Sequence, residues 1–232
     1  MKPVYASTAM ACLITLQGAQ PVAAQVAPSV TEIGQYSGLQ AAAHAGDATR
    51  LRVMTSVAVP ALDARDGRGR TALHIATFAR QREAIRILAK AGAKLELLDN
   101  DRYDAVTIAA VANDPETLML LLSLGASAKL VTSVYDGTAL IAAAHLGHAE
   151  VVRLLIAAGA PLDHVNNLHW TALIESIVLG NGGPAHQQTL SALLSAGANT
   201  QLTDRNGATP LQLARSRGFR EMVALLEKAG AR

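Results

Sequence analysis

The amino-acid sequence predicts an all-α fold, an elongated solenoid of about six similar helix pairs, and three observations lead to this fold class. A short motif recurs along the chain, at Thr71-Ala-Leu, Asp104-Ala-Val, Thr138-Ala-Leu, Thr171-Ala-Leu and Thr209-Pro-Leu. A Gly-Ala pair closes each unit, beginning at Gly92, Gly125, Gly159, Gly197 and Gly230. The units start about 33 or 34 residues apart except for one longer unit, and this period is typical of helical repeat proteins.

The central unit, residues 136–163, shows how each repeat is built. Thr138 suits the N-cap of a short helix over Ala139 to His145, because its hydroxyl can accept a hydrogen bond from an unpaired backbone N–H. A second helix over Glu150 to Ala158 has more than one apolar face. It ends at Gly159, where a left-handed residue is expected. Two helices this short cannot bury these faces alone, so the unit requires copies on both sides.

This pattern resembles the ankyrin repeat, whose motif reads T-P-L-H-x-A-A near the start and L-L-x-x-G-A near the end. The closest matches are residues 71–76, with the sequence TALHIA, and residues 209–211, with the sequence TPL. The resemblance implies a β-turn finger followed by two antiparallel helices in each unit, with fingers and first helices lining a concave face. Further likeness to exported bacterial ankyrin-repeat proteins covers residues 100–114, 132–148 and 164–183.

Residues 1–24 have the order of features of a secretory signal peptide. Lys2 supplies the positive start, Ala9 to Leu16 is a short apolar core, and Val22-Ala23-Ala24 offers small residues for cleavage before Gln25. We therefore expect export to a bacterial periplasm and no membrane insertion after the segment is removed. Cleavage would also remove Cys12, the only cysteine, and with it any disulfide or thiol chemistry.

Residues 25–35 show no helical period and are interpreted as a linker, so the ankyrin-repeat domain is expected over residues 36–232. The first and last units carry extra charged residues on their outer sides, as capping repeats do. In the fifth unit, Gly180 to His186 adds residues between the two helices and is too rich in glycine to be helical. We expect Asn181 to His186 to form an exposed, mobile loop.

Composition and charge argue against several functions. A net charge of +2 is too balanced to indicate nucleic acid as a partner. One arginine cluster is interpreted as a solvated face: Arg65, Arg68, Arg70, Arg80, Arg82 and Arg86. No phosphate-binding loop, paired-cysteine motif or nucleophile elbow is present, so we expect no catalytic residues and no cofactor. The histidine spacing is weak evidence for a metal site, and none is expected.

A stripe of mostly apolar residues is expected along the concave sides of the first helices. In the family pattern these positions hold Ile75, Phe78, Ile108, Val111, His145, Leu146, Glu175 and Val178. Contiguous exposed apolar surface indicates an interaction site. The alternative is that these side chains pack against neighbouring first helices.

Four further residues of the fingers border the same face: Tyr103, Tyr135, His169 and Trp170. Tyrosine and tryptophan favour interfaces because they combine a large apolar area with one polar group. The alternative is that the residue before the N-cap packs on the next finger.

We therefore expect a monomeric, non-catalytic module that binds another exported protein through its concave face. The alternative is a small-molecule or enzymatic site built from Asp101, Tyr103, Asp104, Asp136, Asn166, Asn167, His169 and Glu175. A closed pocket with a carboxylate near His169 would favour this alternative, whereas an open apolar groove would favour protein binding.

Overall fold

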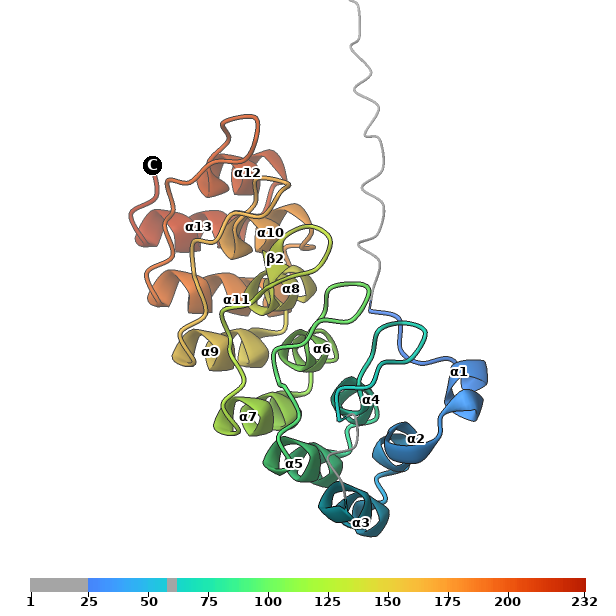
Figure 1. Cartoon of the computed structure of the whole chain (residues 1–232). Helices are drawn as coiled ribbons and strands as arrows, with labels where there is room; N and C mark the ends of the chain where they lie inside the picture. The colour runs from blue at the N-terminus through green and yellow to red at the C-terminus, as the bar shows by residue number, and fades with distance from the viewer. Residues whose placement is uncertain (1–24, 58–61) are drawn as a thin grey trace, which may run out of the picture.

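The computed structural model describes residues 25–57 and 62–232, and these residues form a curved stack of helix pairs (Figure 1). The predicted signal peptide lies outside the described residues. A short helix, α1 (Val30–Gln35), precedes the stack. The six pairs are α2 (Gly38–Ala45) with α3 (Ala48–Val57), α4 (Ala72–Phe78) with α5 (Arg82–Lys90), α6 (Ala105–Val111) with α7 (Pro115–Ser123), α8 (Ala139–Leu146) with α9 (Ala149–Ala157), α10 (Ala172–Val178) with α11 (Pro184–Ser195), and α12 (Pro210–Ser216) with α13 (Arg220–Lys228).

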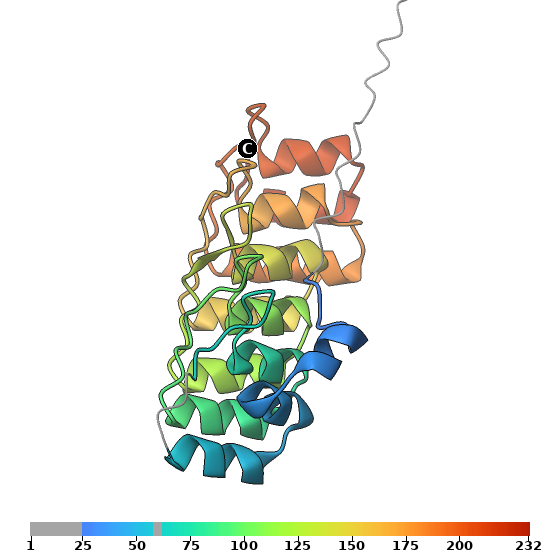
Figure 2. The ribbon, with the colours of Figure 1, turned by 45° about the vertical axis from the view of Figure 1, so that its right-hand side comes forward.

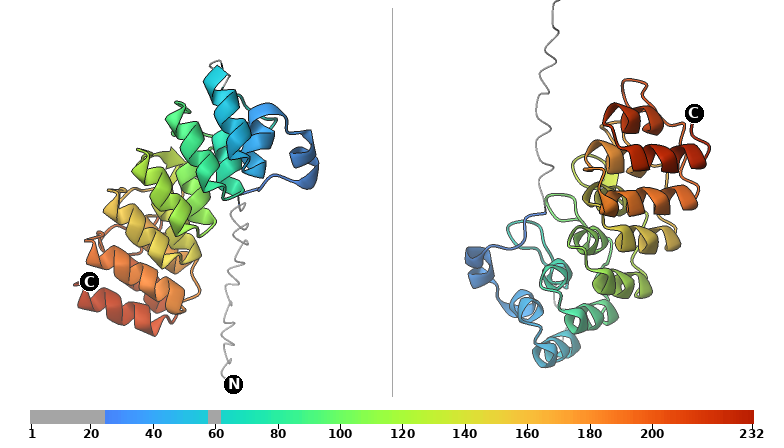
Figure 3. Two further views of the ribbon diagram at one scale, coloured as in Figure 1. Left: turned by 90° about the horizontal axis from the view of Figure 1, so that it is seen from below. Right: turned by 180° about the vertical axis from the view of Figure 1, so that it is seen from behind.

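The stack has an inner and an outer layer. First helices lie side by side on the concave side, second helices form the convex side, and the fingers project along one edge (Figures 2 and 3). The prediction of an all-α solenoid with six helix pairs is confirmed. No helix in residues 25–57 or 62–232 is long and apolar enough to cross a bilayer.

The first helices begin at the predicted capping residues. The hydroxyl of Thr138 accepts a hydrogen bond from the backbone N–H of Ile141 at 3.3 Å. In the third repeat, Asp104 caps α6 through a bond of 2.9 Å from the N–H of Thr107. Helix α8 ends at Gly147, whose φ of 72° places it in the left-handed region that favours glycine. These local signals fix where each helix begins and ends.

The core lies between successive repeats. Small buried residues such as Ala143 and Ala144 allow neighbouring first helices to approach closely. On α9, Leu155 is fully buried, whereas Leu154 is only half-buried against the core. Because each repeat packs only on its neighbours, the stack is stabilised one interface at a time.

In each finger, one side chain accepts hydrogen bonds from two backbone N–H groups. In the third finger, Asp99 Oδ1 accepts from Asp101 at 3.0 Å and from Tyr103 at 2.9 Å. Asp66, Asn166 and Asp204 make the same pair of bonds in their fingers. Such local bonds define the turn, as expected for Asp and Asn in loops.

The fourth finger is one residue longer than its neighbours. It contains the two short strands of the described chain. Strand β1 (Val131–Thr132) pairs antiparallel with β2 (Gly137–Thr138). Backbone hydrogen bonds then join successive fingers. The N–H of Ser133 donates to the carbonyl of Arg102 at 2.8 Å, and the N–H of Asn167 donates to the carbonyl of Tyr135 at 3.0 Å. The fingers therefore form a continuous edge.

The expectation of a non-helical linker is wrong for Val30–Gln35, which is helix α1. Ser29 and Glu32 form a capping box at its start, with each side chain bonded to the backbone N–H of the other residue. This reciprocal pair nucleates a helix that the weak apolar period of the segment did not indicate.

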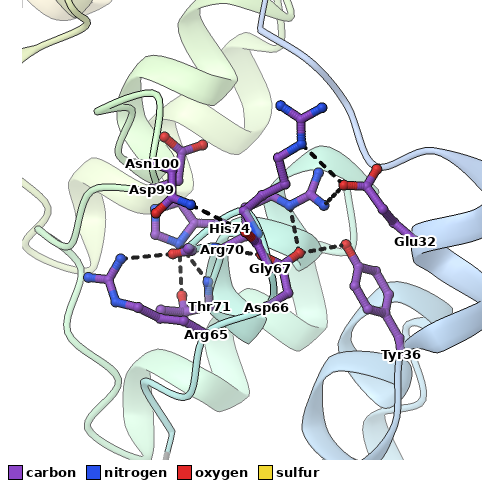
Figure 4. Close-up of polar contacts among 12 residues, drawn as sticks. Glu32, Tyr36, Arg65, Asp66, Gly67, Arg70, Thr71, His74, Asp99 and Asn100 are labelled. Atoms are coloured by element: carbon purple, nitrogen blue, oxygen red, sulfur yellow. Dashed lines mark hydrogen bonds and ion pairs between the residues drawn. The ribbon is translucent and has the colours of Figure 1, made fainter.

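The expectation of a solvated arginine cluster is wrong for Arg70, which is 1% exposed. Figure 4 shows its guanidinium between Glu32 of α1 and Asp66 of the second finger, each at 2.7 Å. The hydroxyl of Tyr36 donates to the same Asp66 oxygen at 3.2 Å. Hydrogen bonds from Ser29, followed by the charge of Arg70, lower the pKa of Glu32 to about 2. Arg70 therefore ties α1 to the repeat stack.

The predicted loop at Asn181 to His186 is also only partly correct. Helix α11 begins at Pro184, a residue whose missing N–H does no harm in the first turn of a helix. His186 lies within α11 and is buried, with one ring nitrogen 2.8 Å from the carbonyl oxygen of His145 and the other 3.1 Å from Asn181 Oδ1. The segment from Gly180 to Gly183 remains non-helical, as predicted.

Candidate binding site

A cavity of about 290 Å³ opens on the concave side of the third, fourth and fifth repeats. Side chains of α6, α8 and α10 form its walls together with the fingers that precede these helices. We call it the concave cavity. It is lined by Gln25, Tyr103, Thr107, Val111, Thr132, Ser133, Tyr135, Gly137, Thr138, Ile141, Ala142, His145, Leu146, Asn166, Leu168 and Glu175.

Two of the residues that line the cavity are small where aligned residues of neighbouring repeats are large. Directly before the N-cap the fourth repeat has Gly137, where its neighbours have Tyr103 and Trp170. Four residues after the N-cap it has Ala142, where the third repeat has Ile108. Larger side chains at these two positions would reduce the cavity.

Glu175 is the one carboxyl group among the residues that line the cavity, and it is 5% exposed. Its Oε1 atom accepts a hydrogen bond from Asn166 Nδ2 at 2.8 Å. Its Oε2 atom lies 3.7 Å from His145 Nδ1 and accepts no hydrogen bond from a described residue. Burial raises the pKa of Glu175 to about 7, because the charged form loses its hydration. Burial lowers the pKa of His145 for the same reason.

Asn166 connects the turn of the fifth finger to this carboxyl. Its Oδ1 atom accepts from the backbone N–H groups of Leu168 and Trp170, at 3.0 and 2.9 Å. The equivalent residues Asp66 and Asp99 hold their turns with a carboxylate, which cannot donate. An amide at this position keeps the turn and leaves Nδ2 free to donate to Glu175.

The segment ahead of α1 also reaches the cavity. It runs across the concave side of the stack before entering α1 (Figure 2). Gln25 lines the cavity, and its Nε2 atom is buried without a hydrogen-bond partner in residues 25–57 and 62–232. Any molecule that enters the cavity therefore meets Gln25 as well as the repeats.

Comparison with known proteins places this geometry in a family. A model of three ankyrin repeats matches residues 106–204, and a model of a single ankyrin repeat matches residues 68–100. The ankyrin repeat protein YahD of Escherichia coli (strain K12) is 34% identical over 191 residues, which is 82% of this chain and 94% of YahD. The chain belongs to the ankyrin-repeat family.

Solved structures of ankyrin-repeat proteins have the same fold as this chain. The ankyrin repeat domain ABAYE2397 of Acinetobacter baumannii AYE is 46% identical with a TM-score of 0.79, over 84% of this chain and 98% of that chain. The ankyrin repeat protein EF0377 is 28% identical with a TM-score of 0.77, over 83% of this chain and 98% of that chain. Ankyrin repeats are generally protein-interaction modules, and a binding role fits this chain.

The ankyrin stack brings together six of the residues predicted to contact a partner. These residues line the concave cavity: Tyr103, Val111, Tyr135, His145, Leu146 and Glu175. The expectation that Ile75 and Ile108 are part of an exposed stripe is wrong. Both are 0% exposed. These two positions are therefore buried, as the alternative considered from the sequence requires.

The other predicted contact residues lie away from the cavity lining. Phe78 and Val178 are half-buried on their helices. His169 is exposed and has a φ of 63°, and Trp170 is half-buried. Tyr135 stands three residues before its N-cap, whereas Tyr103 and Trp170 stand directly before theirs.

Most of the polar residues grouped as a possible catalytic site do not meet. Asp104 is buried as the cap of α6, Asp136 pairs with Arg102 at 3.0 Å, and the side chain of Asn167 donates to the carbonyl of Val134. Asp101 approaches Arg68 at 3.9 Å. Only Tyr103, Asn166 and Glu175 of that set line the cavity.

The side chains of His74 and His148 contact backbone groups. No group of three or more His, Cys, Asp or Glu residues in residues 25–57 and 62–232 is placed to hold a metal ion. His74 lies 3.0 and 3.1 Å from the carbonyl oxygens of Leu97 and Tyr103, so it connects its own helix to the next finger. His148 contacts the carbonyl oxygen of Ala110 in the preceding repeat at 3.0 Å.

Proposed function

We propose that this ankyrin-repeat chain is a non-catalytic module that binds a partner protein exported to the same compartment, the bacterial periplasm, through the concave cavity. The observation that carries the proposal is the cavity itself. It combines apolar walls with one buried carboxyl, on the side of the stack where Leu146 is 40% exposed. Pockets that combine apolar lining with a few placed polar groups are typical of specific recognition.

A non-catalytic role is favoured by the arrangement of the polar groups. Catalysis by acid and base needs two groups held within hydrogen-bond reach of a substrate. The cavity offers Glu175 with His145 at 3.7 Å, and the other carboxylates considered from the sequence lie elsewhere, as N-cap or ion-pair partner. The proposed periplasmic location rests on the sequence of residues 1–24.

The test compares the two faces of one repeat in living cells. A photoreactive amino acid at Leu146 lies at the cavity, whereas the same amino acid at Arg153, exposed on α9, lies on the convex side. Cross-linking followed by mass spectrometry should capture one exported protein from Leu146 and not from Arg153. Capture from both positions, or from neither, would contradict the proposal.

The location is tested separately by the intact mass of the native protein. We expect a mature N-terminus at or within a few residues of Gln25. Native material that retains Met1 or Lys2 would contradict export through a cleaved signal peptide.

A further inference from the structure

Glu175 is a buried acid with no lysine or arginine partner among the described residues. No Lys or Arg is among the described residues that line the cavity, and His145 Nδ1 at 3.7 Å lies beyond hydrogen-bond distance of Oε2. A buried carboxylate is costly unless a positive group or several hydrogen bonds compensate it. In the described structure Oε1 accepts from Asn166, whereas Oε2 accepts no hydrogen bond from a described residue, and the side chain that carries both oxygens lines the cavity.

The pair formed by Glu175 and Asn166 departs from the repeat pattern at two aligned positions. Four residues after the N-cap, the other full repeats have apolar or small residues: Ile75, Ile108, Ala142 and Leu213. At the turn of the finger, Asn166 stands where the second, third and sixth repeats have Asp66, Asp99 and Asp204 and the fourth has Ser133. The repeat can pack without Glu175 or Asn166 at these positions. The two side chains are joined by a hydrogen bond of 2.8 Å from Asn166 Nδ2 to Glu175 Oε1. Departures that lower stability are expected where a fold serves a function.

The remaining lining defines which ligand can enter. Tyr103 and Tyr135 provide aromatic rings, and Val111 and Leu146 provide apolar wall. An anionic ligand would face Glu175 without any lysine or arginine of the lining to compensate it. A neutral apolar ligand would leave Oε2 unpaired. An alkylammonium group satisfies both parts of the site, because its chain contacts the apolar wall, its charge pairs with Glu175, and tyrosine rings attract cations.

We propose that the concave cavity binds a lysine side chain of the partner protein, with its ammonium group paired to Glu175. This inference rests on the proposed function and names the chemistry of its contact. A volume of about 290 Å³ accommodates a four-carbon chain with its charged end. The lysine enters beside Gln25 and reaches the floor between α8 and α10.

Binding of the ammonium group depends on pH. The titratable groups that face Glu175 are His145 on α8, Tyr103 on the finger before α6 and Tyr135 on the finger before α8. Burial raises the pKa of Tyr103, so this ring stays neutral through the physiological range. Ionisation of Glu175 as pH rises strengthens cation binding, and proton uptake by His145 at acid pH weakens it, so both groups act in the same direction.

The experiment uses n-butylammonium as a probe of the lysine side chain, titrated into the full chain and followed by methyl NMR of Ile141 and Leu146. The neutral alcohol 1-butanol, which has the same four-carbon chain, is the matched control. Butylammonium should bind at least about tenfold more tightly than butanol near pH 8, and this preference should largely disappear near pH 5.5. Glu175→Gln should abolish the preference for butylammonium over butanol. Equal binding of both probes, or no dependence on pH, would overturn the inference.

Two further results distinguish the lysine inference from the proposed function, and a partner lysine from a free amine. If Leu146 captures a partner but the two probes bind alike, the lysine inference fails while the proposed function stands. Acetylating the lysines of the captured partner should weaken its binding by more than about tenfold. If butylammonium binds as expected and acetylation has no effect, the ligand is a free amine and the assignment to a partner lysine is overturned.

Discussion

Replacing Glu175 with glutamine should stabilise the fold at neutral and alkaline pH. Glutamine retains an oxygen that can accept from Asn166 Nδ2, at a position where that bond is now 2.8 Å, and it removes the charge. The cavity floor therefore keeps its shape and its hydrogen bond. The variant isolates the cost of the buried carboxyl.

The magnitude follows from the pKa. Burial raises the pKa of Glu175 from its ordinary value of 4.5 to about 7. A folded-state pKa above the unfolded one means that the contribution of this group is fully present below pH 4.5 and is lost as pH rises through about 7. A change of this size corresponds to about 3 kcal/mol, since each tenfold change in proton affinity is worth about 1.4 kcal/mol.

The assay is urea denaturation of the natural chain and Glu175→Gln from about pH 4 to about pH 8.5. The two proteins should differ little near pH 4, and the variant should gain about 3 kcal/mol in free energy of unfolding above pH 7. Glu150→Gln, on the exposed surface of α9, is the control and should show no such growth. A constant difference across the range, or a variant less stable at pH 8.5, would refute the reasoning about the buried carboxyl.

Three further variants, one of them with a matched control, test other parts of the structure by the same denaturation assay. Asn166→Asp keeps the turn but places a second carboxylate beside Glu175, so it should cost about 1–3 kcal/mol near pH 8 and less near pH 5. The control Asp99→Asn should cost less than about 1 kcal/mol, and similar costs for both would contradict the special role of Asn166. Leu155→Ala should cost about 2–5 kcal/mol, and an unchanged midpoint would argue against its place in the core. Arg70→Met should cost about 3–5 kcal/mol, since it leaves Asp66 without its cation and Glu32 with Arg68 alone; a neutral effect would mean that α1 is not held by this contact.

The repeat fold could be predicted from the sequence because its signals are local. The capping residues Thr138 and Asp104 and the closing glycines act within a few residues of themselves, so their spacing revealed the six helix pairs. The burial of Arg70 could not be predicted in this way. Its partner Glu32 lies 38 residues earlier in the chain, in a segment without a helical period.

The candidate site was partly predictable, because the repeat motif shows which positions of each first helix face the concave side. Positions on the first helices pointed to Val111, His145, Leu146 and Glu175, and these residues do line one cavity. Their burial could not be deduced one repeat at a time, because the cavity depends on side chains that the fourth repeat lacks. Aligning the repeats at the N-cap and comparing side-chain size at each position would have revealed Gly137 and Ala142.

The burial of His186 shows a further limit. Glycines and a proline before it indicate a loop, but the loop ends at Gly183 and His186 lies in the first turn of α11. Its ring contacts the carbonyl oxygen of His145, which lies 41 residues earlier in the last turn of α8. Contacts between neighbouring repeats therefore decide which parts of an inserted segment become ordered.

The assignment of the concave cavity as the binding site is tested most directly by the affinity of the cross-linked partner for the Ala142→Ile variant. Isoleucine occupies the equivalent position of the second and third repeats, at Ile75 and Ile108, and the added volume fits within about 290 Å³. If the partner binds through the concave cavity, filling it should weaken binding by more than about tenfold while the melting temperature stays the same or rises. An unchanged affinity in a normally folded variant would contradict the assignment of the cavity as the binding site.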